Sequence, residues 1–464
     1  MATSFAEPHI ATGKSYNRSP SLADASVGGY LSRKEREIAL IADCLATPIP
    51  LPIVSSAANA IDAKFKLAAA LRAERSLQSW AITETARPEV QRWASGAYQF
   101  SYGYQRADLD VEGPSIYALE SSEKRLRHKT VYTGSGMSAI AVVVAALVRT
   151  RRSITVHAQR GCYSETRELL QSLDGQVTIA PFPARGTAIM SANEGARVLL
   201  IDSCVRRGFN DYRRVPVRDI DVVLFDTTCF WQRSSRIRLV LEWAQRAQLP
   251  IVLMRSHAKL DSLGIEYGRL GSLVFVWPRK GPAAKPIATL VQAAEDAVRL
   301  YGAAAIPAHF PPFTGTDAYR ELSAARTAAI IRNTRRMVRA LSARLGGATV
   351  VRDFQHALYL ALAPGKELAL TDVKSAADAL CNALGAQGLP VKHAGSFGFD
   401  FVAVEWFFDA GLRRNVIRVT GADLPVAIID RIVEAIVAWW SQRRMSTEPK
   451  NIHADIKAAE TSST

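Results

Sequence analysis

The chain of 464 residues has no apolar run that approaches the ~20 residues of a membrane-spanning helix. Its first residues also lack the charged region followed by an apolar core that marks a secretory leader. With 48% hydrophobic and 22% charged residues, the composition is that of a globular protein with a large core. We therefore expect a cytoplasmic protein with no membrane partner.

Cysteine is scarce. The five cysteines are odd in number and lack the regular spacing of a metal site or of a disulfide framework. They are scattered along the chain at Cys44, Cys162, Cys204, Cys229 and Cys381. We expect reduced thiols and no metal.

Acidic residues are outnumbered, since 58 Lys and Arg stand against 43 Asp and Glu and the net charge is +15. Such a balance suits a polyanionic partner. However, the arginines are spread over the whole chain and no nucleic-acid-binding motif accompanies them. We expect no nucleic acid; the charge favours an anionic cofactor or substrate and is compatible with a nucleotide-bearing co-substrate.

A lysine follows an apolar run in the middle of the chain. Residues 251–254 are too short for a helix and predict a buried strand that leads to Ser256 and Lys259. A loop with two glycines, Arg269 and a second apolar strand at 273–276 follow. Burial lowers the pKa of an amine and allows it to form a Schiff base, while a hydroxyl and a guanidinium can bind a phosphate nearby.

This segment resembles the cofactor-lysine segment of the fold-type I pyridoxal 5'-phosphate (PLP) enzymes, the aspartate aminotransferase superfamily. The resemblance implies that Lys259 binds PLP as a Schiff base and that Ser256 and Arg269 bind its phosphate. The alternative is that Lys259 is one more surface lysine in a basic chain. Lys280 also follows a strand and is the competing candidate for the cofactor lysine.

Two further segments resemble the cystathionine synthase and lyase branch of this superfamily, the Cys/Met-metabolism branch. Tyr104 and Arg106 match a Tyr-x-Arg segment, which implies contact with the PLP phosphate of a partner subunit. Ser135, Gly136 and Met137 match the phosphate loop of this branch, and a helix start presents free amides to an anion. The alternatives are an aromatic-rich surface loop and an ordinary strand–helix turn.

An aromatic residue follows the strand at 154–157. Tyr163 stands where the resemblance places a ring that stacks on the pyridine of the cofactor. A tyrosine of the core is the alternative.

Two short apolar strands end in aspartate, at Asp202 and at Asp226. The resemblance implies that one carboxylate keeps the pyridine nitrogen protonated. We favour Asp226 because it lies 33 residues before Lys259, with one amphipathic helix between them. Asp202 remains the alternative.

The chain departs from the family at three places. Residues 205–207 are Val-Arg-Arg where the family has an Asn for the phenolic oxygen of the cofactor, and Cys229 stands where aminotransferases have a Tyr. Ala258 replaces the hydroxyl residue that usually precedes the lysine. These departures bear on the electronic tuning of the cofactor, not on its anchoring.

Substrate-side residues are expected near the C-terminus. The strand at 415–421 resembles an Ile-Arg-x-Ser strand, which implies that Arg418 binds the substrate α-carboxylate with two hydrogen bonds. Ser396 lies in a segment that resembles a loop near the substrate. Because Arg418 stands between two apolar residues on a strand, its charge needs a partner.

The resemblance implies an α/β fold of the PLP-dependent transferase type I, a mainly parallel seven-stranded sheet with a smaller C-terminal α/β domain. Such enzymes bind PLP at a subunit interface, so it also implies a homodimer or homotetramer. We divide the chain into a flexible arm (1–28), an N-terminal helical segment (29–100), a large PLP-binding domain (101–310), a small C-terminal domain (311–444) and a disordered tail (445–464).

The expected activity is that of a PLP-dependent lyase or transferase on an amino acid, through an external aldimine and deprotonation of Cα. The predicted catalytic residues are Lys259, Asp226 and Tyr163. The loop at 135–137 and the segment with Tyr104 and Arg106 favour β/γ-elimination or γ-replacement, and the second of these features is the rarer one in the superfamily. The reaction is compatible with a sulfur-linked or S-adenosylmethionine-type substrate. An aminotransferase is the alternative, because the segment 259–269 is more similar to one. A non-catalytic PLP-fold binding protein is the second alternative, given the departures above.

Overall fold

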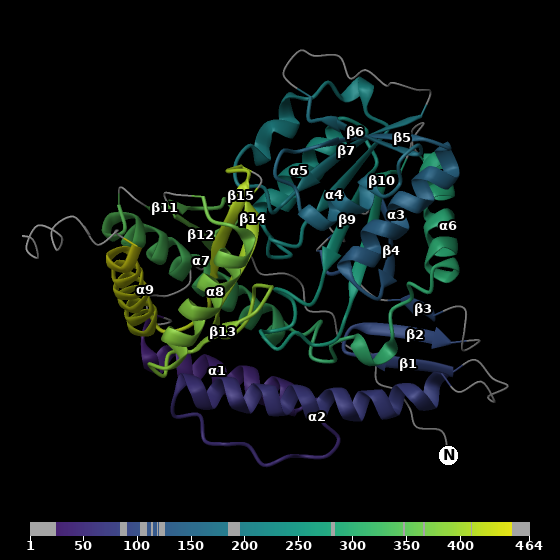
Figure 1. Cartoon of the computed structure of the whole chain (residues 1–464). Coiled ribbons are helices and arrows are strands. Elements are labelled where there is room, and N and C mark those ends of the chain that lie inside the picture. Colours follow the sequence, from purple (N-terminus) through teal and green to yellow (C-terminus); the bar gives the residue numbers. More distant parts are fainter. Residues whose placement is uncertain are drawn as a thin grey trace, which may run out of the picture.

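A computed structural model of the chain describes residues 25–83, 91–102, 109–112, 115–117, 119, 126–183, 195–279, 284–346, 349–364, 367–409 and 411–447. Within these residues the chain forms a large and a small α/β unit that lie side by side, with the N-terminal helices running along both (Figure 1). Tyr104, Arg106 and Lys280 lie outside the described residues. The predicted arm at 1–28 and tail at 445–464 also lie mostly outside them, and the domain boundaries stay predictions.

The large unit is built on a seven-stranded sheet. Only β10 runs antiparallel to its neighbours β4 and β9, and the other adjacent strands are parallel. This confirms the predicted mainly parallel sheet. The strands, in spatial order, are β4 (Leu126–Thr133), β10 (Gly271–Pro278), β9 (Ile251–Ser256), β8 (Val222–Asp226), β7 (Ala196–Asp202), β5 (Ile154–Ala158) and β6 (Val177–Pro181).

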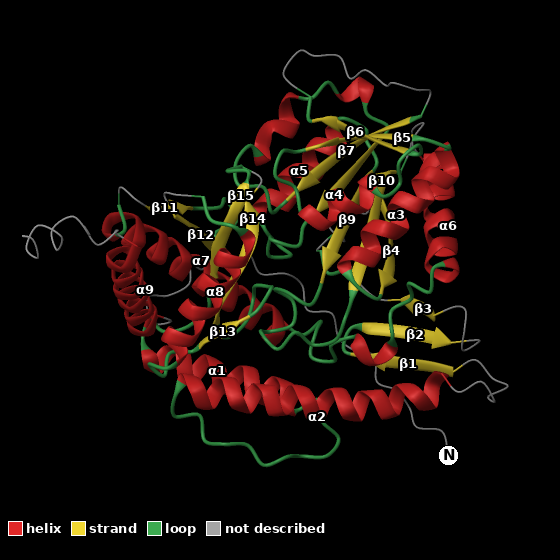
Figure 2. Ribbon diagram, in the orientation of Figure 1, coloured by secondary structure: helices red, strands yellow, loops and turns green. Residues whose placement is uncertain are grey.

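Helices cover both faces of this sheet (Figure 2). On β7, Val198 and Leu200 belong to the core with α3 and α6, whereas Leu199 and Ile201 belong to the core with α5. Burial on both faces explains why these strands are continuous apolar runs in the sequence. The elements around the sheet are α3 (Gly136–Arg151), α4 (Ser164–Gln171), α5 (Ser235–Arg246), α6 (Ala284–Leu300), η3 (Phe209–Arg214) and η4 (Val217–Asp219).

The small unit has a five-stranded sheet in the order β11 (Thr349–Arg352), β12 (Tyr359–Pro364), β15 (Arg414–Thr420), β14 (Val402–Asp409) and β13 (Val391–His393). Three helices pack on one face, α7 (Asp317–Arg344), α8 (Leu370–Gly385) and α9 (Val426–Thr447). On the other face, Val416 packs in one cluster with Cys229 and Leu260 of the large unit. This second face therefore points to the end of β9 that carries Lys259.

The N-terminal region contains α1 (Val27–Ala42) and α2 (Ala57–Thr83), which the sequence predicts as helices. It also contains a three-stranded antiparallel sheet that the sequence reading did not predict. Its strands β1 (Gln91–Ser95), β2 (Tyr98–Tyr102) and β3 (Leu109–Glu112) have only four or five residues each. A short 3₁₀ turn, η5 (Pro307–His309), packs against α2.

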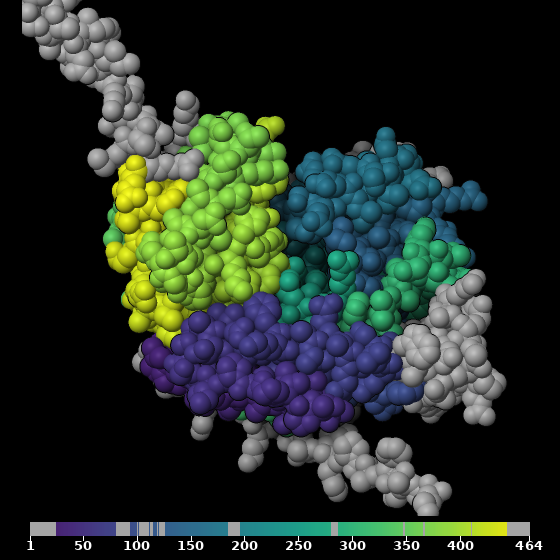
Figure 3. Space-filling view, turned by 60° about the horizontal axis from the view of Figure 1, so that its bottom comes forward, coloured from purple at the N-terminus to yellow at the C-terminus, as the bar shows by residue number. Residues whose placement is uncertain are grey.

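The space-filling view shows a recess between the two α/β units, above the N-terminal helices (Figure 3). Among the described helices, none is both long and apolar enough to cross a membrane.

Candidate functional site

Two aspartates stand side by side where β7 and β8 end. Asp202 and Asp226 are paired in the parallel register. Asp202 accepts main-chain hydrogen bonds on both oxygens, from Tyr163 and from Cys204, each over 2.8 Å. Asp226 is hydrogen-bonded only to Thr228 among the described residues, over 2.8 Å from the main-chain nitrogen. Asp226 is therefore the carboxylate that has capacity left for another donor.

The protonation of this pair is set by burial. Burial, and then the charge of Asp202, raise the pKa of the Asp226 carboxyl to about 7. Burial also raises the pKa of Asp202. A buried carboxyl with an open position gains most from a cationic N–H group, which restores its charged form. A protonated pyridine nitrogen is such a group.

The loop at 135–137 lies against the end of β9. A Cβ atom built on Gly136 would lie 2.7 Å from Cβ of Ser256, and one built on Gly271 would collide with the main chain of Ser135. Glycine at both positions thus lets the loop approach β9 and β10 closely. Ser135 caps α3, a 16-residue helix, by accepting a hydrogen bond from the Ser138 amide over 3.0 Å.

This arrangement places two hydroxyls, Ser135 and Ser256, at the positive end of a helix. Free amides, hydroxyls and the helix dipole together suit a phosphate. The Ser256 amide donates to Thr228 Oγ1 over 3.1 Å, and the Thr228 amide donates to Asp226. Thr228, which the sequence analysis did not single out as a site residue, therefore connects Ser256 to Asp226.

Lys259 lies in the turn after β9 and is partly buried. Its Nζ donates a hydrogen bond to Oγ of Ser396, and it lies 5.9 Å from the ring centroid of Phe397. Burial is the main cause that lowers the pKa of the Lys259 amine; the charge of Arg418 lowers it further and Glu266 opposes the shift. A lowered pKa increases the neutral, nucleophilic fraction of the amine.

The segment 396–398 is packed on the backbone of this lysine. Gly398 has a φ of +90°, and a Cβ atom there would lie 2.7 Å from the main-chain oxygen of Lys259. A side chain at Gly398 would be both strained and obstructed. The structure thus brings Ser396 of the small unit to Lys259 of the large one, although the sequence placed Ser396 only near the substrate.

Tyr163 and Arg269 lie at the rim. The Tyr163 side chain is 40% exposed, so it is not a core residue, and its main-chain amide is bound to Asp202. Arg269 is exposed; it lies two residues before Gly271, which pairs with Ser256. Both positions are compatible with the predicted contacts to ring and phosphate.

Arg418 points to the face of the small sheet opposite its helices. Its charge contributes to the lowered pKa of Lys259 and acts against the raised pKa of Tyr163, which places it on the same side of the molecule as both. The partner that the sequence required is Glu405 on β14, which accepts from Nη2 of Arg418 over 2.7 Å. The sequence reading missed Glu405, although a charged residue between the apolar Val404 and Trp406 of a strand was a signal.

The departures from the family are visible in the structure. Val205 is fully buried, and Arg206 forms an ion pair with Asp353 over 3.2 Å. Cys229 is buried, with its amide bound to Ser203 Oγ over 2.9 Å, and burial raises the pKa of its thiol well above the usual value. These positions supply neither an amide nor a phenol for the phenolic oxygen of a cofactor.

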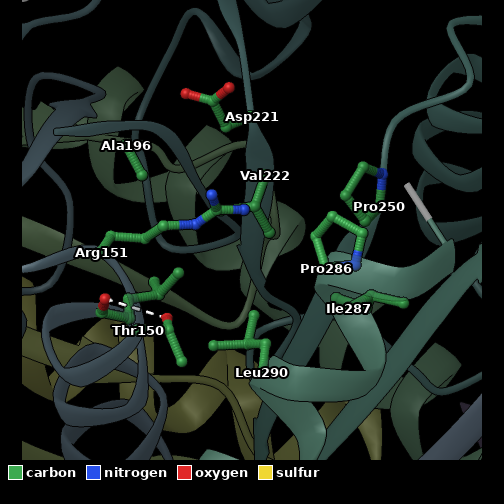
Figure 4. A pocket seen from close by; sticks show the side chains of 10 residues that line it. Thr150, Arg151, Ala196, Asp221, Val222, Pro250, Pro286, Ile287 and Leu290 are labelled. Carbon is green, nitrogen blue, oxygen red and sulfur yellow. Dashed lines mark hydrogen bonds between the residues drawn. The ribbon is translucent and has the colours of Figure 1, made fainter. Parts of the chain in front are cut away.

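A separate pocket, open to solvent, lies at the amino ends of β7, β8 and β9 (Figure 4). It is lined by Arg151 of α3, Leu290 of α6 and Asp221, which precedes β8. Asp221 is already bound to the main-chain amide of Arg197 over 2.7 Å. Because ligands of α/β sheets bind at the carboxyl ends of the strands, we assign no function to this pocket.

No family model matches the sequence, and no curated protein matches it. Similar solved structures include a cystathionine γ-synthase from Xanthomonas oryzae pv. oryzae, with 15% identity over 67% of this chain and 81% of that chain and a TM-score of 0.43. They also include an O-acetylhomoserine sulfhydrylase of Wolinella succinogenes (15% identity, 66% and 91% covered, TM-score 0.45) and a serine palmitoyltransferase of Sphingomonas wittichii (11% identity, 69% and 73% covered, TM-score 0.47). Because these TM-scores lie below 0.5, we base the function on the side chains of this chain.

Proposed function

We propose that this protein is a PLP-dependent enzyme that acts on a substrate with a primary amine, in the simplest case an amino acid. The observation that carries the proposal is the combination of three groups on adjoining strand ends. They are the buried Asp226, which can accept a further hydrogen bond, the hydroxyls of Ser135 and Ser256 at the start of α3, and Lys259, whose amine has a lowered pKa. These groups match the ring nitrogen, the phosphate and the aldehyde of PLP.

When bound, PLP would supply an electron sink for the cleavage of bonds at the carbon next to the substrate amine. Asp226 would keep the ring nitrogen protonated, and Ser135 and Ser256 would bind the phosphate. Lys259, whose amine has a pKa lowered by burial, would remove the proton from the substrate carbon while Ser396 orients its amine. Tyr163 would cover the ring; burial and Glu165 raise the pKa of its phenol, so the phenol stays protonated.

The reaction proposed is elimination or replacement at the β or γ carbon. The sequence Ser135-Gly136-Met137, which resembles the phosphate loop of the cystathionine synthase and lyase branch, supports this choice over transamination. The second candidate function is a non-catalytic binding protein, because Val205 and Cys229 supply no hydrogen-bond donor of the family type to the phenolic oxygen of the cofactor.

A homodimer or homotetramer is part of the proposal. Apolar side chains are exposed beside the phosphate loop, with Leu300 at 60%, Tyr301 at 67% and Ile306 at 51%. The same segment is tied to the loop, since the Gly134 amide donates to the Ala303 oxygen over 2.8 Å. A second copy that covers this apolar surface would lie next to the cofactor.

The test is cofactor binding and its location. The protein incubated with PLP should acquire a visible absorption band that Lys259→Ala removes, and borohydride reduction followed by peptide mapping should find the pyridoxyl group on Lys259. A pyridoxyl group on Lys280 would transfer the role to that lysine. Absence of any specific binding would reject the proposal.

A further inference from the structure

Arg418, the proposed ligand of a substrate carboxylate, already has a carboxylate partner in this chain. Arg418 on β15 and Glu405 on β14 face each other in the antiparallel register. The guanidinium Nη2 donates to Oε2 over 2.7 Å, and the two side chains are 13% and 23% exposed. An ion pair with this burial is screened by water far less than a surface pair.

The pair is held from both sides. The guanidinium carbon of Arg418 lies 5.6 Å from the ring centroid of Tyr359 and 5.8 Å from that of Phe407, within the range of cation–π attraction. A Cβ atom on Gly395 would lie 3.0 Å from Oε1 of Glu405, so the carboxylate is packed against the main chain there. Gly395 precedes Ser396, the residue that binds Lys259.

This geometry affects how a substrate is recognised. A carboxylate that approaches Arg418 meets a guanidinium whose charge is already neutralised, and Glu405 repels it at short range. A primary amine without a carboxylate on the reacting carbon meets no such opposition. Its ammonium form is instead attracted by Glu405.

We propose that Glu405 is a specificity-determining residue, which weakens the binding of α-amino acids and makes the site favour primary amines that carry no free carboxylate on the reacting carbon. This inference rests on the proposed function for its meaning in catalysis. Amino acids still bind, but only in competition with Glu405 for Arg418.

The test compares three probes on wild type and on Glu405→Gln, a substitution that keeps the size of the side chain. On the PLP-loaded protein, wild type should bind pentylamine at least as tightly as L-norleucine, which differs from it by one carboxylate. Glu405→Gln should bind L-norleucine about tenfold more tightly or better, as followed by titration calorimetry. Adding Arg418→Met to Glu405→Gln should abolish this gain.

The third probe, hexanoate, separates this inference from the proposed function. Hexanoate, which has no amine, should bind the protein without PLP about tenfold more tightly in Glu405→Gln than in wild type. As a control, Asp430→Asn removes one charge from the exposed pair with Arg336 in the same unit and should change neither affinity. Unchanged or weaker carboxylate binding in Glu405→Gln would overturn the inference, whereas failure to bind PLP would reject the proposed function alone.

Discussion

Lys64, on α2, donates a hydrogen bond from Nζ to the main-chain oxygen of Leu263, four residues after Lys259. The same amine contacts Glu37 over 2.5 Å and Asp400 over 2.7 Å. It belongs to a fully buried group of side chains that we call the buried charge cluster, with four cations and three anions: Arg33, Lys34, Lys64, Arg326, Glu37, Asp400 and Asp423. The cluster ties the N-terminal helices to the loop after Lys259 and to the small unit.

Within the described part of the chain, the acids of this cluster, Glu37, Asp400 and Asp423, are the one group whose ligand atoms lie close enough together to hold a metal ion. The cations of the cluster already occupy it, since Lys34 contacts Glu37, Asp400 and Asp423 over 2.7–2.8 Å. We interpret the cluster as a structural link and not as a metal site.

Replacement of Lys64 should destabilise the protein strongly. Lys64→Met removes one partner from a buried ionic network and leaves Glu37, Asp400 and the Leu263 oxygen with fewer donors. We expect a loss of about 3–5 kcal/mol in the free energy of unfolding, measured by chemical denaturation. Lys66→Met, two residues along the same helix in an exposed pair with Asp62, should cost about 1 kcal/mol or less. Equal losses in the two variants would contradict the structural role of Lys64.

The close approach of the loop at 135–137 to β9 gives a second prediction. In Gly136→Ala the new methyl group must push the loop away from Ser256, and such overpacking costs about 1–3 kcal/mol. The dissociation constant for PLP should therefore rise by about tenfold to a hundredfold, as measured by titration of the visible band. Gly134→Ala is the control, because the nearest atom to its new Cβ is 3.4 Å away. A similar effect of both variants would mean that the loop does not bind the phosphate.

Asp226 should make the stability of the cofactor-free protein depend on pH. The pKa of its carboxyl rises from 3.8 to about 7 on folding, so the folded protein holds a proton that the unfolded chain releases. The contribution of Asp226 to the free energy of unfolding is then fully present at low pH and is lost as pH rises from about 4 to about 7. Asp226→Asn lacks this titration. Between pH 5 and pH 8 its free energy of unfolding should therefore fall by roughly 2–4 kcal/mol less than that of wild type.

Denaturation of both proteins at the two pH values measures this difference. Asp353→Asn, on an exposed carboxylate, should leave the pH dependence of wild type intact. With PLP bound, Asp226→Asn should also abolish exchange of the substrate α-hydrogen with solvent. Normal exchange in this variant would transfer the role at the ring nitrogen to Asp202.

Local patterns were enough to predict the elements that carry the site. The apolar run before Lys259, the small residues at 135–137 and the aspartates after two strands each mark the end of a buried strand or the start of a helix. Such signals lie within a few residues and do not depend on distant packing. The choice of Asp226 over Asp202 agrees with their hydrogen bonds, although cofactor contact itself stays a prediction.

The features that the sequence did not reveal depend on contacts between distant segments. Glu405 meets Arg418 only because β14 and β15 pair in one register, and Lys64 reaches Leu263 across 199 positions of the chain. Charged residues such as Lys34 and Lys64 are ordinarily read as surface residues, because buried charges are rare without partners. Their partners come from α1 (Glu37) and from three loops (Leu263, Asp400 and Asp423), which no local pattern connects.

The last prediction concerns the reaction type. We expect O-acetyl-L-homoserine, an amino acid with a γ leaving group, to be converted with water into acetate, ammonia and 2-oxobutanoate over many turnovers. The carbon next to the amine and then the β carbon each lose a proton, and acetate leaves the γ carbon. Protons return to the γ and β carbons, and hydrolysis of the resulting imine releases ammonia. Tyr163, which lies at the rim with a raised phenol pKa, is placed to donate a proton in this sequence. The visible band should persist, because each turnover returns the cofactor in its aldehyde form.

L-Norleucine, a straight-chain amino acid with no leaving group, is the matched control and should give no ammonia. A transaminase would instead convert it to the keto acid once per site, with loss of the visible band until a second keto acid is added. No change with either amino acid, in wild type and in Glu405→Gln, would favour a binding protein without turnover.

Tyr163→Phe should slow elimination while leaving PLP binding unchanged within about threefold, because the ring still stacks and only the phenolic proton is lost. Full elimination activity in that variant would exclude Tyr163 as the proton donor.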